Sequence, residues 1–292
     1  MHPKNNDILR NYVITTENAI DNIFSSSIAP KTSVSEAMKY SLDAGGKRIR
    51  PSLVMEFCRV ISGDYKKSIN AAVAIEMIHT FSLIHDDLPC MDDDDFRRGK
   101  PSCHKKFGEA IALLAGDALE NLAFRVIISS DYDDKTKSCL ISEISDATAK
   151  MIDGQVRDLS FLERTDISED DLLEMYSLKT CALIECSAVM GCICGGADKN
   201  ELMLAREYAH NLGLAFQIRD DILDVIGDEK ELGKPIGSDA DNNKTTIVSV
   251  LGIEKASELA KKYSDNALNK LDSFKNNDFL KDLTKLLLER YK

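Results

Sequence analysis

Apolar residues recur along this chain with the three-to-four-residue spacing of amphipathic helices, whereas runs that alternate every second residue are hard to find. In residues 7–24, for example, Ile8, Tyr12, Ile20 and Phe24 fall at helical spacing. Proline, which interrupts helix interiors, occurs only six times among 292 residues. The pattern predicts an all-α fold.

Local signals divide the chain into helices without dividing it into domains. Gly45 and Gly46 follow one helical pattern as a C-cap would, Pro51 opens the next at its first turn, and Pro89 ends a long one. Helices are expected at residues 7–24, 34–44, 52–61, 66–88, 107–128, 135–159, 169–194, 200–226, 247–251, 255–271 and 279–291. No repeat or long linker separates them, so a single domain over residues 1–292 is expected.

Charge and cysteine usage narrow the environment and the partners. The formal net charge of -12 argues against nucleic acid or an anionic membrane as the main partner. The most apolar stretch, residues 180–197, contains Glu185 and is short for a span, so it is interpreted as a buried helix wall. The N-terminus lacks the apolar core of a secretory signal, and the eight cysteines include no CxxC pair. Reduced, packed thiols and a cytoplasmic location are expected.

The densest chemical signal is an acidic run directly after an apolar helix. Six of the ten residues from 86 to 95 are Asp. Most acidic runs on a surface are simply solvated, but few of those follow a helix that is expected to be buried. Carboxylates this close need counter-charge, and Mg²⁺ binds through one or two carboxylates together with substrate phosphate oxygens.

A second acidic group lies on a later helix. Asp220 and Asp224 are four residues apart, as are Gln217 and Asp221, so all four fall on one stripe. Apolar residues such as Ile222 occupy the other face. Two Asp-rich helices predict one metal and diphosphate site across a shared cavity.

Basic residues flank both acidic groups and also a pair of glycines. Singly, such residues are usually solubility residues, but beside glycine turns in an acidic chain they fit anion binding. They are Arg97, Arg98 and Lys100 after the first group, Lys230, Lys234 and Lys244 after the second, and Lys47 and Arg50 beside Gly45 and Gly46. Neither GxxxxGK[ST] nor GxGxxG occurs, so nucleotide use is unsupported.

Together these residues resemble the short-chain trans-prenyl diphosphate synthases, and the bacterial-type farnesyl diphosphate synthases in particular. The resemblance runs from residue 45 to residue 244, in the order of the family's motifs. The matching blocks are Asp86, Asp87 and Asp92; Arg97, Arg98 and Gly99; Gly116 to Leu119; Gly154, Gln155 and Asp158; Lys179 and Thr180; Phe216, Gln217, Asp220, Asp221 and Asp224; and Lys234 in its Gly-Lys-Pro-Ile-Gly segment.

The resemblance implies an isoprenoid synthase fold, with helices packed around a deep central cavity, and a homodimer. It implies a prenyltransferase that condenses isopentenyl diphosphate head to tail with dimethylallyl or geranyl diphosphate, using about three Mg²⁺ ions in each active site. The allylic C–O bond would ionise, the alkene would attack the cation, and a dry pocket would exclude water.

The resemblance also implies roles for single residues. Asp86, Asp92 and Asp220 would ligate Mg²⁺, with Asp87, Asp221 and Asp224 in or next to the ligand set. Arg97, Lys179, Lys234 and Lys244 would hold the allylic diphosphate, and Lys47, Arg50, His79 and Arg98 the isopentenyl diphosphate. Thr180 and Gln217 would border the developing cation. A His on an apolar helix is more often a core residue, but His79 lies seven residues before Asp86 and shares its stripe.

Product length is expected to depend on Phe81 and Ser82, which lie five and four residues before Asp86. In the family, an aromatic residue near this place limits elongation, commonly to fifteen carbons. The helical wheel places Ser82 beneath Asp86 and Phe81 to the side, so Phe81 could equally be plain core packing. Farnesyl diphosphate is the favoured product, and geranylgeranyl diphosphate is the alternative.

Three other functions compete with synthesis. A terpene cyclase would want a hydroxyl residue where Asp224 stands, and its pocket would favour aromatic walls, whereas this chain has no Trp and 6% aromatic residues. A non-catalytic subunit would typically have lost Asp or Lys positions, and none is lost here. A phosphohydrolase would need an activated water and would tolerate loss of the apolar cavity.

Overall fold

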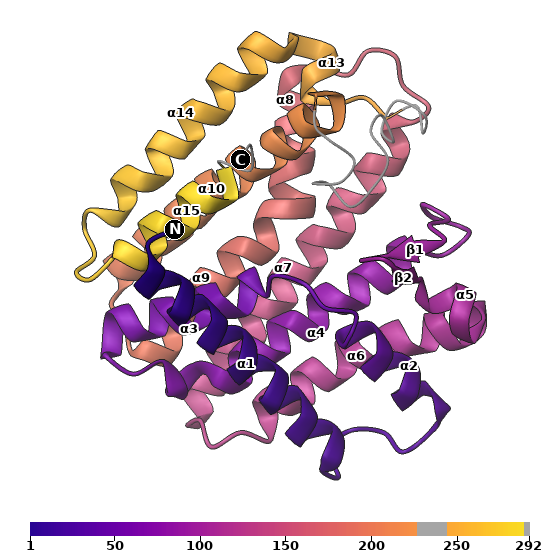
Figure 1. Ribbon diagram of the computed structural model, residues 1–292, viewed down its shortest axis with the longest axis vertical. Coiled ribbons are helices and arrows are strands. Elements are labelled where there is room, and N and C mark those ends of the chain that lie inside the picture. Colours follow the sequence, from indigo (N-terminus) through magenta and orange to yellow (C-terminus); the bar gives the residue numbers. More distant parts are fainter. Residues whose placement is uncertain (227–243, 289–292) are drawn as a thin grey trace.

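The computed structural model describes residues 1–226 and 244–288, and nearly all of its regular structure is helical (Figure 1). The first part contains α1 (Pro3–Ser25), α2 (Ser33–Leu42), α3 (Ile49–Ser62), a 3₁₀ turn (Tyr65–Ser68), α4 (Ile69–Asp86), α5 (Cys103–Phe107), α6 (Glu109–Ile128) and α7 (Asp134–Phe161). The second part contains α8 (Glu169–Tyr176), a π turn (Ser177–Cys181), α9 (Ala182–Gly195), α10 (Lys199–Ile226), α13 (Ile247–Leu251), α14 (Ile253–Leu271) and α15 (Asp278–Leu288). The all-α prediction is confirmed.

The departures from the expected helices are local. The helix expected over residues 66–88 begins with a 3₁₀ turn and ends at Asp86, and the one expected over 107–128 is divided at Gly108 from the short helix α5. A hairpin of β1 (Phe96–Arg97) and β2 (Lys100–Pro101) was not expected, because two-residue strands are too short to show a period. Residues 289–291 of the last expected helix lie outside the described part of the chain.

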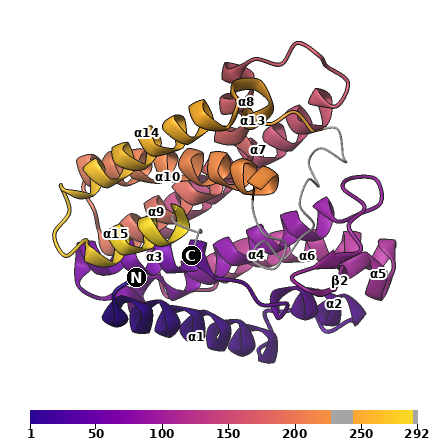
Figure 2. The same cartoon turned by 45° about the horizontal axis from the view of Figure 1, so that its top comes forward.

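The most apolar helix, α9, lies inside the fold. It packs against α3, α7 and α10, and Figure 2 shows it between these elements. A Cβ added at Gly191 would lie 2.3 Å from the carbonyl oxygen of Val54, so this glycine lets α9 approach α3 closely. The run Glu169–Gly195 is long and apolar enough to cross a membrane by length and composition, but 61% of its most apolar window is buried in the fold. The expectation of a buried helix wall is confirmed.

Two apolar clusters form the interior. The larger one is built mainly from helices α1 to α10 and includes α15. The second cluster lies behind the second acidic stripe and consists of Phe161, Leu172, Met175, Tyr176, Cys181, Leu214, Ile218, Ile222, Ile247, Val248, Ala256 and Ala260. Helix α10 contributes to both clusters, because its polar stripe leaves apolar residues on more than one side.

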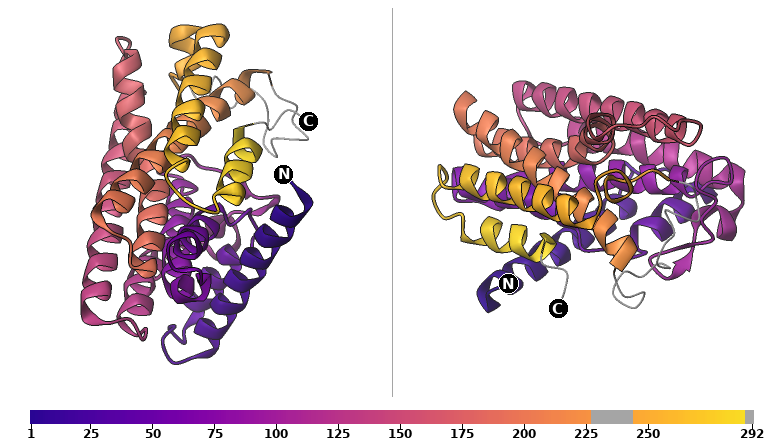
Figure 3. Two further views of the ribbon diagram at one scale, coloured as in Figure 1. Left: turned by 90° about the vertical axis from the view of Figure 1, so that its left-hand side faces the viewer. Right: turned by 90° about the horizontal axis from the view of Figure 1, so that it is seen from above.

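Helix α15 returns to the first helix of the chain (Figure 3). The backbone N–H of His2 and the side-chain amide of Asn5 both donate to Asp282 Oδ2, each at 2.8 Å. These contacts place α1, α3 and α15 side by side at one end of the molecule.

All eight cysteines lie in described residues, and none of them is in a disulfide. Cys186 and Cys192 are buried, and burial raises the pKa of both thiols well above its usual range. The thiols therefore act as small apolar side chains here, as their sequence context predicted.

Helix α8 gives a direct test of local stability. The Ser168 hydroxyl accepts from the Asp171 backbone N–H, and the Asp171 carboxylate accepts in return from the Ser168 backbone N–H, at 3.2 and 3.0 Å. We expect Ser168→Ala to lower the free energy of unfolding by about 1 kcal/mol, because the first turn loses a hydrogen-bond acceptor. Denaturant unfolding measures this, with exposed Thr165→Ala as the control. Equal stabilities of the two variants would contradict it.

Candidate active site

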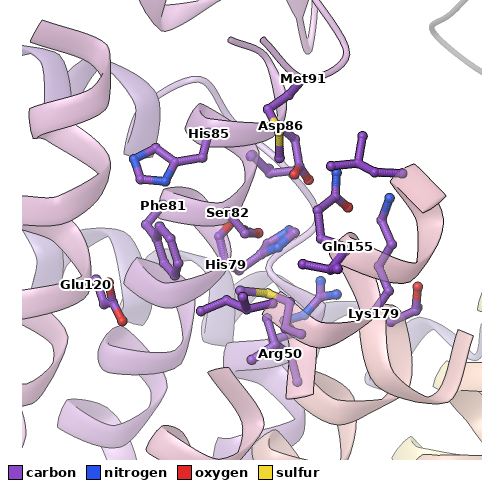
Figure 4. Close-up of a pocket in the computed structure, with 17 residues that line it drawn as sticks. Arg50, His79, Phe81, Ser82, His85, Asp86, Met91, Glu120, Gln155 and Lys179 are labelled. Atoms are coloured by element: carbon purple, nitrogen blue, oxygen red, sulfur yellow. Dashed lines mark hydrogen bonds between the residues drawn. The ribbon is translucent and has the colours of Figure 1, made fainter. Parts of the chain in front are cut away.

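A cavity of about 460 Å³ opens among α4, α7 and the π turn. Its polar wall includes Arg50, His79, Ser82, Asp86, Gln155, Lys179 and Thr180, and its apolar wall includes Phe81, Met151, Ile152, Val156, Leu159 and Leu183. Figure 4 shows Asp86, Gln155 and Lys179 on one side of this cavity and Phe81 with Glu120 on the other. The cavity therefore has a charged end, which carries Asp86 and Lys179, and an opposite end around Phe81, which is called the apolar end although Glu120 also lies there.

Asp86 stands at the charged end, as the last residue of α4. Burial raises the pKa of its carboxyl to about 6, an effect that Lys179 opposes and the neighbouring Asp92 strengthens. The backbone N–H of Asp92 donates to the Asp86 carbonyl at 2.9 Å, so the loop after α4 folds back on the helix end. Lys244, which precedes α13, contacts Asp92 with its Nζ 3.1 Å from Oδ1.

The Asp87 carboxylate points away from this cavity and pairs with Arg97. Asp87 is 2% exposed and accepts from both Nε and Nη2 of Arg97, while Asp94 also accepts from Nη2 at 2.8 Å. The β1–β2 hairpin holds Arg97 at this place. The two residues predicted to bind metal and diphosphate thus bind one another in this structure.

Gln217 of the second acidic stripe contacts Thr180, a residue of the cavity wall. Thr180 Oγ1 donates to Gln217 Oε1 at 2.9 Å, and Gln217 Nε2 donates to Asp221 Oδ1 at 3.1 Å. The other oxygen of Asp221 accepts from the Tyr176 hydroxyl at 2.5 Å and from the Ile247 backbone N–H at 3.2 Å. Asp221 is therefore surrounded by protein donors and fixes Gln217, whereas Asp220 lies partly exposed and Asp224 is buried on the same helix.

Lys179 owes its position to a break in helix regularity. It lies in the π turn Ser177–Cys181, and single π turns often occur at functional sites. Gly154 on α7 lies directly against this turn, since a Cβ there would be 2.3 Å from the backbone nitrogen of Lys179. The Lys179 ammonium pairs with Asp158 at 2.5 Å. One turn of α7 thus provides both the close approach and the counter-charge.

The glycines of residues 45–50 form a turn around a cluster of arginines. Gly45 and Gly46 have φ values of 91° and 123°, which side chains rarely adopt. A Cβ at Gly46 would lie 2.7 Å from Cζ of Arg98, and Arg98 donates to the Gly45 carbonyl. Lys47 is exposed beside them, and Arg50 projects into the cavity.

Burial and neighbouring positive charges lower the pKa values of Arg50 and His79. Burial, helped by the nearby Arg98 and opposed by Glu76, lowers the pKa of Arg50 to about 10. Burial also lowers the pKa of His79 well below its usual value, as do Arg50 and Arg98. His79 is therefore a neutral imidazole at pH 7, suited to hydrogen bonding rather than to ion pairing.

The apolar end is built around Phe81. Phe81 is 5% exposed, and its ring packs edge to face on the His85 ring, with the ring centroids 5.3 Å apart. His85 fits because the facing residue is Gly116, where a Cβ would lie 2.1 Å from Nε2 of the imidazole. The Ser82 hydroxyl donates to the His79 carbonyl at 2.9 Å. Both residues predicted to set product length line the cavity.

The residues present fit Mg²⁺, although no preformed cage holds it. Within the described residues, no three Asp, Glu, His or Cys side chains converge as a metal-ligand group. Mg²⁺ does not need such a cage, because it binds through one or two carboxylates and completes its sphere with water and substrate phosphate oxygens. Asp86 supplies a half-buried carboxylate at the cavity, and the crowding of Asp86 by Asp92 is the environment that a divalent cation relieves.

Among the described residues, seven of the predicted side chains line this cavity, namely Arg50, His79, Phe81, Ser82, Asp86, Lys179 and Thr180. Gln217 contacts Thr180 of the cavity wall, whereas Asp220, Asp221 and Asp224 of the second acidic stripe do not line the cavity. Lys234 lies outside the described residues, while Asp87, Arg97 and Arg98 line a separate, smaller pocket beside the hairpin. Sequence reasoning did not assign roles to Gln155 and Asp158, although both stand in a matching block. Both polar atoms of the Gln155 amide are buried without a hydrogen-bond partner among the described residues, which marks it as a ligand-facing group.

Comparison with known proteins agrees with this geometry. A model of the polyprenyl synthetase family matches residues 31–287. The chain is 42% identical over 273 residues to the heterodimeric geranylgeranyl pyrophosphate synthase large subunit 1, chloroplastic, of Arabidopsis thaliana, which covers 90% of this chain and 74% of the relative. The solved geranylgeranyl pyrophosphate synthetase from Pyrococcus horikoshii superposes with a TM-score of 0.89 at 31% identity, covering 98% of this chain and 99% of that one. A geranyltransferase from Helicobacter pylori, complexed with magnesium and isoprenyl diphosphate, gives 0.84 at 30% identity, covering 99% and 98%.

Proposed function

The chain belongs to the polyprenyl synthetase family of prenyl diphosphate synthases, and we propose that it joins isopentenyl diphosphate head to tail to an allylic diphosphate. The observation that carries this proposal is that one cavity combines charged side chains at one end with an apolar wall at the other. Asp86 and Lys179 at the charged end suit a diphosphate with its cation, and the wall around Phe81 suits a hydrocarbon tail. Arg50 and His79 line the same cavity, as a second diphosphate substrate requires.

The side chains of the site divide the work of ionisation and coupling. Mg²⁺ held by Asp86, Asp92 and Asp220 would neutralise the charge that grows on the leaving diphosphate. Lys179 and Lys244, released from Asp158 and Asp92, add positive charge at the same end. As the allylic C–O bond breaks, the oxygens of Thr180 and Gln217 border the cation.

Isopentenyl diphosphate, the second substrate, is held for attack by His79 and the basic residues near the glycine turn. Lys47, Arg50, Arg98 and neutral His79 position isopentenyl diphosphate so that its alkene forms the new C–C bond. A proton then passes from that unit to an oxygen of the departed diphosphate. Met151 and Leu183 exclude water, which would otherwise capture the cation.

For the product, we propose geranylgeranyl diphosphate. The Arabidopsis relative and the Pyrococcus structure both carry that product in their names. The sequence favoured farnesyl diphosphate because of the aromatic residue five positions before Asp86, and farnesyl diphosphate stays the second candidate because Phe81 does line the cavity. Names of relatives and one wall residue thus point to different lengths.

Product analysis with each primer tests both the reaction and the length. Purified protein, Mg²⁺ and labelled isopentenyl diphosphate would be incubated with dimethylallyl, geranyl or farnesyl diphosphate, and the dephosphorylated alcohols separated. Geranylgeraniol from all three primers would support the proposed product, and farnesol that is not extended would support the second candidate. A cyclic or unextended product from every primer would contradict the coupling reaction.

Phe81→Ala tests whether this ring limits the tail. We expect the product distribution to shift by at least one five-carbon unit, because the substitution removes a buried ring from the cavity wall. The alcohols from wild type and variant would be compared by chromatography. Phe107→Ala, at a ring that packs on Tyr40, is the matched control. Identical product lengths in the Phe81 variant would exclude the ring as the limiting group.

We also propose a homodimer in the cytoplasm, with the whole chain acting as one synthase domain. Ile152 and Val156 line the cavity, yet they are 49% and 61% exposed in the single chain. A second copy on α7 would cover this apolar stripe and complete the wall. Unpaired thiols throughout the chain fit a reducing compartment.

A further inference from the structure

A buried ion pair lies behind the glycine turn and outside the set of residues assigned to the reaction. Nη1 of Arg48 donates to Oε1 of Glu76 at 2.7 Å, and the two side chains are 1% and 2% exposed. The other terminal nitrogen, Nη2, donates to the Leu42 carbonyl at 2.5 Å. Arg48 thus joins four elements, because Leu42 ends α2, Glu76 lies in α4, Arg48 itself caps α3, and Oε1 of Glu17 in α1 lies 3.9 Å from Nη2.

The backbone of Arg48 shows that this pair holds a conformation that the chain would not adopt unaided. Its φ of 48° and ψ of 41° are left-handed, which is unfavourable for a residue with a side chain. Gly45 and Gly46 precede it at positive φ, so Arg48 is the anchored end of the turn. The Arg48 carbonyl then accepts from Ser52 and begins α3.

The substrate-facing cations stand on both sides of this anchor. Lys47 precedes Arg48, Arg50 follows it by two residues and enters the cavity, and Arg98 lies against Gly46. Glu76 also offsets the charge of the cluster, since its carboxylate raises the pKa of both Arg50 and Arg98 against the effect of burial. A rotation at Arg48 would therefore move Lys47 and Arg50 together.

We propose that Glu76 and Arg48 are positioning residues that fix the turn at residues 45–50 and so determine affinity for isopentenyl diphosphate. The inference rests on the proposed function, which assigns Lys47, Arg50 and Arg98 to that substrate. Glu76 does not bind the substrate. Its carboxylate acts through Arg48, whose planar fork reaches Glu76 and the Leu42 carbonyl at once.

Two variants test the two residues of this ion pair. Glu76→Gln removes the carboxylate charge while keeping the length of the side chain, and Arg48→Lys keeps the charge but cannot bridge Glu76 and Leu42. We expect each to raise KM for isopentenyl diphosphate about tenfold, the effect of losing about 1.4 kcal/mol of a charge-assisted interaction. KM for the allylic diphosphate and kcat at saturation should change less than about twofold, because neither Asp86, ten residues after Glu76 at the end of α4, nor Lys179, in the π turn, is part of the turn at residues 45–50.

The matched control is Glu56→Gln on α3. Glu56 is also a fully buried carboxylate, and it binds Arg59 and the Tyr12 hydroxyl, but it does not line the cavity. Thermal unfolding would establish that each variant is folded, and calorimetric titration with isopentenyl diphosphate would measure binding without turnover. The control should keep the wild-type dissociation constant.

The outcomes separate this inference from the proposed function. Weaker binding of isopentenyl diphosphate in either folded variant, with an unchanged control, supports the positioning role. Unchanged or tighter binding overturns it, and so does an equal loss for both substrates, which a merely structural role would produce. Should wild type bind isopentenyl diphosphate without coupling it, the proposed reaction would fail while the calorimetric comparison still decides the role of Glu76.

Discussion

Asp86→Asn is expected to reduce kcat about a thousandfold, because the site loses the cavity carboxylate on which Mg²⁺ and the leaving diphosphate depend. KM for either substrate should change far less, since the interaction matters most as charge develops on the leaving group. Single-turnover assays at saturating Mg²⁺ measure the loss. A variant that keeps more than about a tenth of wild-type kcat would contradict the role of Asp86.

The same acidic run provides the control. Asp95 is 63% exposed and pairs with Lys105 at 2.7 Å, so Asp95→Asn should leave kcat within about twofold. Thermal stability should distinguish the two positions as well. The folded-state pKa of Asp86 is raised, so the ionised carboxylate opposes folding above about pH 6 and not below the ordinary pKa of Asp. In the absence of divalent cations at pH 7.5, Asp86→Asn should therefore be at least as stable as wild type.

Gly154→Ala is expected to reduce kcat about a hundredfold although it changes no charged group. The added Cβ would lie 2.3 Å from the backbone nitrogen of Lys179 and 2.6 Å from the Cα of the same residue, so the π turn must move away from α7. That movement separates Lys179 from Asp158 and withdraws the ammonium from the charged end of the cavity.

Overpacking alone also destabilises a protein, so the Gly154 test needs a comparison at another helix contact. Gly191→Ala brings a Cβ to the same 2.3 Å, from the Val54 carbonyl oxygen between α9 and α3. Both variants should lose about 1–3 kcal/mol of stability by denaturant unfolding. At a temperature where both are folded, only the Gly154 variant should have lost its kcat. Similar kcat losses in both would assign the effect to stability.

Sequence reasoning recovered what depends on short-range spacing. The stripe of Gln217, Asp220, Asp221 and Asp224 is visible because residues four apart share one face of a helix. The all-α fold is likewise visible, since each helix repeats its own apolar pattern. Within the stripe, however, Asp221 binds Tyr176 and the Ile247 backbone, and contacts so distant in sequence leave no periodic trace.

Pairings between distant residues explain most of what the sequence did not reveal. Arg97 and Asp87 belong to neighbouring motifs, but only the two-residue hairpin turns one onto the other. Glu76 has no partner at helical spacing that would single it out, and its proposed role depends on Arg48, 28 positions earlier. The π turn that carries Lys179 is only five residues long, and no propensity scale signals it.

The second apolar cluster has a consequence for the order in which the molecule folds. All its members lie within residues 161–260, so it closes shorter loops than the larger cluster, which needs α1 and α15 together. The contact between Lys244 and Asp92 spans 152 positions and joins the neighbourhoods of the two clusters. We therefore expect the charged end of the cavity to form late in folding, when an earlier C-terminal unit meets the helix that carries Asp86.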